Sequence, residues 1–252
     1  MLRAPRAAFF AVLLAALAAT PARAKSWFHV PGETRQLVVV TTKSFTAITG
    51  ELRRFEMVRG AWKRVGPAIP VAIGKGGLGW GAGLYPGSHK MPGPQKREGD
   101  GRSPMGIFSL GTVTGYAPAP PPGTKMPYLQ ATPALRCVDD AKSDQYNRLT
   151  PAPADGPPPW HSDEAMRRDD ALYEWTIFVD HNVNPRTPGR GSCIFLHVWR
   201  TPDSPTVGCT SMAREELQSL IQWLDPAAHP LLVQFAGREW SPGRDLGLPM
   251  KL

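Results

Sequence analysis

The chain has 252 residues, 42% of them hydrophobic, which is enough for one domain with a buried core. Its 28 prolines and 25 glycines disfavour a helical bundle, because both residues interrupt helices, and favour a loop-rich, mainly β fold. The net charge of +8 suits an anionic partner, but the basic residues are scattered and no zinc-finger, helix-turn-helix or aromatic RNA-binding pattern is present, so we expect no nucleic-acid binding.

The first 24 residues have the pattern of a signal peptide. Arg3 and Arg6 form a positive region, residues 9–19 are apolar, and residues 22–24 (Ala-Arg-Ala) match an A-x-A cleavage motif. A membrane anchor is the alternative, but the apolar run is shorter than the roughly 20 residues that span a bilayer. We expect cleavage after Ala24 and a periplasmic or secreted protein without stable membrane insertion, in a compartment where disulfides persist.

Most of the remaining chain is predicted to form strands, because β-branched and aromatic residues are concentrated in short runs. The predicted strands are RQLVVVTT, AITGELRRFEM paired with GAWKRV as a hairpin, IPVAIG (69–74) as a separate short strand, a strand entered from KREGDGRSPM, LYEWTIFVDHN, SCIFLHVW and LLVQF. The glycine-rich run 74–83 lacks the Gly-Lys-Ser/Thr of a P-loop, so a flexible surface loop is predicted there.

Near the C-terminus the hydrophobic period changes. Apolar residues from Leu217 to Leu224 recur at i, i+3, i+4 and i+7, which predicts an amphipathic helix, with Ser211 as its cap. Residues 149–170 are rich in proline and are predicted to be a surface insertion that acts as a lid. The predicted organisation is a signal peptide (1–24), an N-terminal segment (25–34), a catalytic domain (35–237) and a tail (238–252).

Cys209 and His197 are the candidate catalytic pair. His197 ends an apolar strand, and Cys209 is predicted to open the helix that follows. A helix N-terminus favours a thiolate, and a nearby imidazole can take the thiol proton as general base and return it as general acid. Gly208 allows another backbone to approach the sulfur, and backbone N–H groups there are candidates for an oxyanion hole. The spacing alone leaves open a structural cysteine and a core histidine.

The window IFLHVWRTPDSPTVGCTSM resembles the active-site region of the L,D-transpeptidases, the YkuD or ErfK/YbiS family. In that family a strand-end histidine precedes a Ser-His-Gly-Cys segment whose cysteine attacks a peptidoglycan stem peptide. His197 matches the histidine, Gly208-Cys209 match the last pair, and SPMGIF (103–108) and KREGDG (96–101) are similar to further family segments. The resemblance covers about residues 35–235 and implies a mixed β-sheet or sandwich domain with a few short helices.

The sequence departs from the family signature at several positions. Thr206, Val207 and Ser211 occupy the places of the signature serine, histidine and arginine. The missing guanidinium would bind a substrate carboxylate bidentately, and we expect other residues to take over substrate binding. The candidate substrate-binding residues are Thr206, Arg200, Ser211, Trp199, Lys96 and Arg97.

The other two cysteines, Cys137 and Cys193, are expected to form one disulfide. Three pairings, or none, are compatible with the sequence, and a bridged Cys209 could not act as a nucleophile, which favours Cys137–Cys193. Asp180 is a candidate orienter of His197, although strand ends often carry Asp to satisfy turns. A zinc site of Asp180, His181 and His197 lacks the usual ligand spacing, so we expect no metal and no cofactor.

The expected function is therefore a monomeric, cysteine-dependent L,D-transpeptidase that joins peptidoglycan stem peptides through an acyl-thioester, in 3,3 or 1,3 cross-links. If water replaces the acceptor amine, the same site is an L,D-carboxypeptidase or an amidase that releases wall-bound protein. A non-catalytic secreted wall-binding module is the alternative of a different class, and it would not need a reactive thiol.

Overall fold

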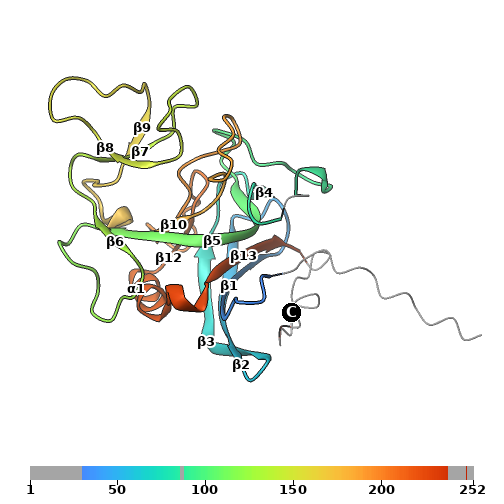
Figure 1. Ribbon diagram of the computed structural model, residues 1–252. Helices are drawn as coiled ribbons and strands as arrows, with labels where there is room; N and C mark the ends of the chain where they lie inside the picture. Colours follow the sequence, from blue (N-terminus) through green and yellow to red (C-terminus); the bar gives the residue numbers. More distant parts are fainter. Residues whose placement is uncertain (1–29, 86–87, 238–247, 249–252) are drawn as a thin grey trace, which may run out of the picture.

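The computed structural model describes residues 30–85, 88–237 and 248 (Figure 1). The predicted signal peptide, residues 25–29 of the 25–34 segment and all of the 238–252 tail except Leu248 lie outside the described residues. Leu248 packs against the main hydrophobic core. Within the described residues, no helix has both the length and the apolar character needed to cross a membrane.

Strands dominate the described chain, which confirms the mainly β prediction. One large sheet contains β1 (Gln36–Thr42), β2 (Thr49–Val58), β3 (Ala61–Ala72), β4 (Leu78–Trp80), β5 (Ser103–Gly115), β6 (Tyr128–Gln130), β10 (Trp175–Val179), β11 (Phe195–Val198), β12 (Thr210–Met212) and β13 (Leu231–Ala236). Its order is β10-β11-β12-β3-β2-β1-β13-β5-β4, with β6 also on β5. Because β10 pairs with both β11 and β5, the sheet closes on itself as a barrel.

The centre of this sheet is β1, whose residues Leu37 to Val40 are almost completely buried. It lies parallel to β13 and antiparallel to β2, with Val39 opposite Val233 on one side and Arg53 on the other. A strand buried on both faces has a continuous apolar sequence, which is why this segment could be recognised.

The predicted hairpin is present, but the predicted short strand at 69–74 is wrong as a separate element. Residues 69–72 are the last third of β3, which runs from Ala61 to Ala72 through Gly66 and Pro67. The pairing register shifts between Leu52 and Arg54 of β2, opposite this interruption. A bulge of this kind absorbs residues that break a regular strand, so one long bent strand replaces two short ones.

The glycine-rich run 74–83 is not the flexible surface loop that the composition predicts. It contains β4, which is buried and parallel to β5. Gly77 has a φ of +76°, and a Cβ there would lie 2.0 Å from the carbonyl oxygen of Phe45. The glycines are therefore required by close backbone packing rather than by mobility.

Gly77→Ala is expected to destabilise the protein by about 2–4 kcal/mol, because it combines left-handed backbone strain with a clash against Phe45. Gly60→Ala is the matched control: its φ is +80°, but nothing lies within 4 Å of the added Cβ. Urea unfolding of both variants measures the difference. Equal losses of stability in the two would contradict a packing role for the run.

The amphipathic helix is present as α1 (Arg214–Trp223), and Leu217, Leu220 and Ile221 are its buried residues. The predicted cap is wrong. The N-cap position is Ala213, and Ser211 lies two residues earlier in β12, opposite His197 of β11 and Ala72 of β3. Pairing with β11 and β3 keeps residues 210–212 extended. The helix therefore begins later than its hydrophobic pattern alone suggests. Three short 3-10 helices complete the described elements: η1 (Ser88–Lys90), η2 (Ala171–Tyr173) and η3 (Pro226–Ala228).

A second, three-stranded sheet stands beside the barrel and contains β7 (Leu135–Val138), β8 (Leu149–Pro151) and β9 (Asp163–Ala165) in the order β8-β7-β9 (Figure 1). The proline-rich insertion 149–170 supplies two of these strands. Cys137 of β7 forms a disulfide with Cys193, which is the pairing that the sequence favours, and Cys209 is the free cysteine. The disulfide thus ties the small sheet to the segment that enters β11.

Candidate active site

Cys209 lies immediately before β12, at the end of a tightly fixed turn. The hydroxyls of Ser103 and Thr206 both donate to its carbonyl oxygen at 2.6 Å, and the N–H of Gly208 donates to the Thr206 hydroxyl at 3.1 Å. Gly208 has a φ of +153°, and a Cβ there would be 3.2 Å from the carbonyl oxygen of Arg102. Glycine is therefore needed for this backbone, and its N–H is already bonded within the turn.

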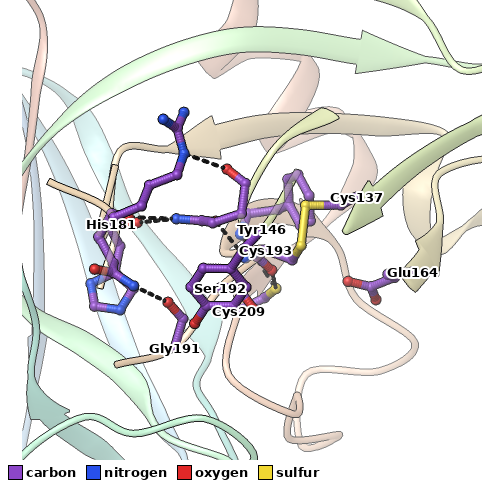
Figure 2. Close-up of a disulfide and its surroundings, with 12 residues drawn as sticks. Cys137, Tyr146, Glu164, His181, Gly191, Ser192, Cys193 and Cys209 are labelled. Atoms are coloured by element: carbon purple, nitrogen blue, oxygen red, sulfur yellow. Dashed lines mark hydrogen bonds between the residues drawn. A yellow bond between two sulfur atoms is a disulfide. The ribbon is translucent and has the colours of Figure 1, made fainter. Parts of the chain in front are cut away.

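The sulfur of Cys209 is buried, with 3% of the residue exposed. The backbone N–H of Phe195 donates to Sγ at 3.3 Å, and the carbonyl oxygen of Cys193 is 3.8 Å away. Figure 2 shows Cys209 next to Cys193. Burial, and then the charge of Glu164, raise the pKa of the thiol to about 12, against smaller opposing effects of Phe195, Tyr173 and Lys96.

The expected thiolate at a helix N-terminus is therefore wrong for the structure as it stands. Strand β12 separates Cys209 from α1, so the thiol lies outside the first helical turn, where the helix dipole acts. Desolvation disfavours the charged form of a group in an apolar environment. The surroundings include Tyr173 and Phe195, and the resting thiol is protonated at neutral pH.

Alkylation of Cys209 by iodoacetamide is expected to accelerate about tenfold per pH unit from pH 7 to pH 10, without a plateau. A pKa of about 12 leaves roughly one thiolate in 10⁵ molecules at pH 7, and this fraction grows tenfold with each unit until the pKa is approached. Mass spectrometry of the modified protein measures the rate. A plateau below pH 8 would contradict the buried, protonated thiol.

Tyr173 and Glu164 complete the surroundings of the thiol. The Tyr173 hydroxyl donates to Oε1 of Glu164 at 2.5 Å, and Tyr173 belongs to the same buried hydrophobic cluster as Cys209. Tyr173 is almost fully buried at the end of η2, and Glu164 is half-buried in β9. Burial raises the pKa of both groups, and the charges of Cys209 and Glu164 raise that of Tyr173 further. In Figure 2, Glu164 and His181 lie on opposite sides of Cys209.

His197 is buried in β11, on the strand parallel to the one that follows Cys209. Its Nδ1 is 2.7 Å from the carbonyl oxygen of Val198. Burial lowers the imidazole pKa to about 4, so the ring is neutral. The Tyr173 ring packs edge-on against it with 5.2 Å between centroids. Tyr173 therefore contacts His197 directly and shares a buried cluster with Cys209.

A pocket of about 420 Å³ opens over the sulfur. It brings Cys209 and Gly208 together with charged groups of both signs. These charged residues are Lys75, Lys96, Glu98, Asp139, Asp163 and Glu164. Lys96 is buried, and its ammonium donates to Oδ1 of Asp100 at 2.7 Å and to the carbonyl oxygen of Arg97 at 2.8 Å. The pocket can therefore receive a substrate with both charged and apolar parts.

The other predicted substrate-binding residues are spread over different environments. Thr206 shapes the turn beneath the pocket rather than its wall, and Ser211 is buried in β12, where its hydroxyl has no hydrogen-bond partner among the described residues. Arg97 is exposed. Trp199 is half-buried, and Arg200 is exposed with a guanidinium nitrogen 3.7 Å from Oδ2 of Asp170. Among the six candidates, Lys96 is the one that lines the pocket over Cys209.

Asp180 and His181 belong to other surroundings. Asp180 lines a different pocket that also contains Arg148 and Arg186, and burial raises its pKa to about 6. The partner of His197 Nδ1 is a backbone carbonyl oxygen, not Asp180. Nδ1 of His181 accepts from the N–H of Ala82 at 3.2 Å, and its Nε2 lies 2.9 Å from the carbonyl oxygen of Arg190. The ring therefore links the backbone at Ala82 to the backbone at Arg190. The described residues include no group of three His, Cys, Asp or Glu placed to hold a metal ion.

Sequence reasoning missed Tyr173 and Glu164. The sequence predicts a strand at Tyr173 and a surface lid at Glu164. No motif or spacing links either residue to Cys209, because they reach the sulfur from η2 and from the small sheet. The one available signal was the short polar stretch directly before a buried strand, where functional side chains often lie.

Comparison with known proteins gives the following. The family model described as the L,D-transpeptidase catalytic domain, YkuD, matches residues 36–233. No curated protein matches the chain at a significant level. Two solved structures are similar. Bd1075 of Bdellovibrio bacteriovorus has 14% identity and a TM-score of 0.37, covering 85% of this chain and 54% of that one. The helical cell shape determining protein Pgp2 of Campylobacter jejuni has 13% identity and a TM-score of 0.35, covering 81% and 48%. The chain spans about half the length of these two structures.

Proposed function

We propose that this chain, which belongs to the YkuD family of L,D-transpeptidase catalytic domains, joins peptidoglycan stem peptides. The transfer depends on a cysteine and passes through an acyl-thioester. The family acts on peptidoglycan. The observation that carries the proposal is the position of the single free cysteine. Cys209 lies at the floor of a charged pocket, with a backbone N–H already directed at its sulfur.

In the first half of the proposed reaction, Sγ of Cys209 attacks the amide carbonyl that follows the third residue of a donor stem peptide. The bond to the terminal D-alanine breaks, the leaving amine takes up the proton that the thiol gave, and an acyl-thioester remains. The Phe195 N–H stabilises negative charge on the sulfur. The Lys96 ammonium acts in the same direction.

In the second half, the side-chain amine of another stem peptide attacks the thioester. His197 is the proposed general acid/base of this transfer. Because burial keeps its imidazole neutral, it can accept a proton from the attacking amine and return it to the sulfur. Because Nδ1 lies against the carbonyl oxygen of Val198, Nε2 is the ring nitrogen that must face the reacting groups. With this donor the product is a 3,3 cross-link, and a 1,3 cross-link requires the same attack at the first residue of the donor stem peptide instead.

Lys96 is the proposed binding group for a substrate carboxylate, in place of the arginine that the family signature has. It is buried, cationic and part of the pocket wall. We assign Thr206 and Gly208 to shaping the turn, and Arg200, Arg97 and Trp199 to outer contacts with the polymer. Residues 149–170 form part of the wall through Asp163 and Glu164, and we propose that this segment also shields the thioester from water.

We propose that the reaction takes place in the periplasm or outside the cell. The Cys137–Cys193 disulfide supports this location, because disulfides persist in oxidising compartments and are rare in the cytosol. The predicted signal peptide supports it independently.

Intact-protein mass spectrometry after incubation with a disaccharide tetrapeptide tests the function. The expected result is an adduct on Cys209 whose mass corresponds to the donor minus D-alanine. Cross-linked dimers among the products establish a transpeptidase, and free tripeptide establishes a carboxypeptidase. Absence of an adduct with both tetrapeptide and pentapeptide donors, together with unchanged muropeptides, would overturn the acyl-enzyme proposal and favour a wall-binding module.

A further inference from the structure

The small sheet has a pocket at each of its two edges. At the β9 edge, Asp163 and Glu164 line the pocket over Cys209. At the β8 edge, Leu149 and Thr150 line a different pocket of about 650 Å³, called the β8-edge pocket below. Strand β7 lies between the two edge strands. The proposed reaction uses the first pocket and leaves the β8-edge pocket without a role.

The β8-edge pocket is lined by three charged side chains that have no charged partner. They are Arg148, Arg186 and Asp180, and none of them takes part in an ion pair between described residues. The Arg186 side chain makes one hydrogen bond, from Nε to the carbonyl oxygen of Asn147 at 3.4 Å. Within the described part of the chain, the side chains of Arg148 and Asp180 make none. Two cations and one anion are therefore open to a ligand.

The charges of this pocket suit a ligand that carries both signs. Desolvation and the charge of Arg148 lower the pKa of Arg186, against the charge of Asp180. A carboxylate bound between the two guanidinium groups relieves their repulsion and accepts bidentate hydrogen bonds. Burial raises the pKa of Asp180 to about 6, so this carboxyl group is ionised at neutral pH and suits an ammonium ion.

Apolar side chains form another part of the same lining. They come from Leu149 of β8, Phe178 of β10 and Val183 after β10. Apolar walls beside a few polar groups are typical of a small-molecule site, where the walls bury the carbon chain and the polar groups fix its end. The β8-edge pocket thus suits an aliphatic chain that ends in a carboxylate and an ammonium group.

Asn147 fixes the wall between the two pockets. Its side-chain nitrogen donates to the carbonyl oxygens of His181 at 2.8 Å and Asn182 at 2.9 Å. Its Oδ1 accepts from the N–H of Cys193 at 2.9 Å. Asn147 lines the β8-edge pocket and Cys193 lines the pocket over the thiol, so a ligand on Arg186 is held at a defined place relative to the candidate active site.

We propose that the β8-edge pocket binds the zwitterionic amino-acid end of a stem-peptide side chain, with its carboxylate on Arg148 and Arg186 and its ammonium group on Asp180. The site stands on its own geometry, and the choice of a stem peptide as the ligand rests on the proposed function. Because the polymer carries many stem peptides, one held here keeps the protein on the wall while another enters the pocket over Cys209.

The test is a two-dimensional amide NMR titration of the full chain with Cys209→Ala, in which no acyl transfer can take place. The probe is a disaccharide tripeptide whose third residue is meso-diaminopimelate, because its one free amine belongs to an amino-acid end. Amide signals of Gly111 and Thr112 report on the β8-edge pocket, and those of Gly99 and Gly101 report on the pocket over residue 209. We expect saturable shifts at Gly111 and Thr112.

Substitutions assign the two ends of the ligand. Arg186→Gln and Asp180→Asn are each expected to weaken binding at Gly111 and Thr112 by ~5–10-fold, at the low end for a charged hydrogen bond because the pocket is open to water. Arg64→Gln, which changes an exposed arginine of β3, is the matched control and should bind as the parent does. Thermal unfolding of each variant checks that the fold is retained.

Acetylation of the free amine of the probe gives a readout that a merely structural role of Asp180 would not move. Acetylation is expected to weaken binding by ~5–10-fold in the parent. In Asp180→Asn the same acetylation should cost less than about twofold, because the ammonium group has already lost its partner. An equal cost in both proteins would overturn the pairing of the ammonium group with Asp180.

The source of the ligand is tested with D-alanine, which has the same end group without the aliphatic chain. It is expected to bind at least ~10-fold more weakly than the tripeptide, because it buries fewer methylene groups. Equal affinity would overturn the stem peptide as the ligand. Absence of saturable shifts at Gly111 and Thr112 with millimolar tripeptide would overturn the site itself. The proposed function fails separately, since it is judged by the adduct on Cys209 and this titration requires no reaction.

Discussion

Cys209→Ala is expected to abolish acyl-enzyme formation, with a loss of at least ~10⁴-fold in the single-turnover rate. The alanine removes the one atom that can form the thioester, and the other two cysteines are joined in a disulfide. Intact-protein mass spectrometry with a disaccharide tetrapeptide measures the adduct directly, and analysis of the products measures dimer and tripeptide.

Cys209→Ser is the matched control for this result. It keeps an atom that can accept from the Phe195 N–H, but the hydroxyl is a far weaker nucleophile than a thiolate. Both variants should unfold at nearly the wild-type temperature, because the protonated thiol makes only long hydrogen bonds. An adduct on Cys209→Ala of the same mass as on the wild type would place the nucleophile elsewhere and contradict the assignment.

Removal of the Cys137–Cys193 disulfide by Cys137→Ser/Cys193→Ser is expected to cost about 2–5 kcal/mol in the free energy of unfolding. The bridge joins residues 56 positions apart and ties the small sheet to the entrance of β11. It also restrains Cys193, whose carbonyl oxygen faces the Cys209 sulfur, and the sheet that carries Glu164. Urea unfolding measures the stability. Single-turnover acylation measures the effect on the site, and we expect acylation to become slower as well.

The double variant is preferred to either single one because it leaves no unpaired thiol that could attack the donor or form a wrong disulfide. Unfolding of the wild type with and without a reducing agent provides the control. If the free energy of unfolding changes by less than about 1 kcal/mol in both experiments, the bridge does not set the stability of the fold.

A protonated resting nucleophile has a consequence in an oxidising compartment. Oxidation proceeds through the thiolate, so a thiol with a pKa of about 12 is protected until it reacts with substrate. The same burial makes activation harder, because forming the thiolate requires a proton acceptor close to a desolvated sulfur.

The sequence by itself determined the features that depend on local pattern. Leu37 to Val40 form a strand because a continuous β-branched run suits a strand buried on both faces, and Leu217 to Leu224 form a helix because apolar residues recur on one helical face. The resemblance of the window around His197 and Cys209 also pointed to the family that the comparison found. These signals lie within a few residues of one another in the chain.

Only the tertiary structure decided the features that depend on residues distant in sequence. The glycines at 74–83 are needed because Phe45 and Gly101 approach them, which no local pattern reveals. Ser211 is extended rather than a cap because β11 and β3 pair with it. Cys209 has a raised pKa rather than a lowered one because the folded chain buries it and Glu164 reaches it from another element, and desolvation is a property of the folded surroundings, not of the neighbouring sequence.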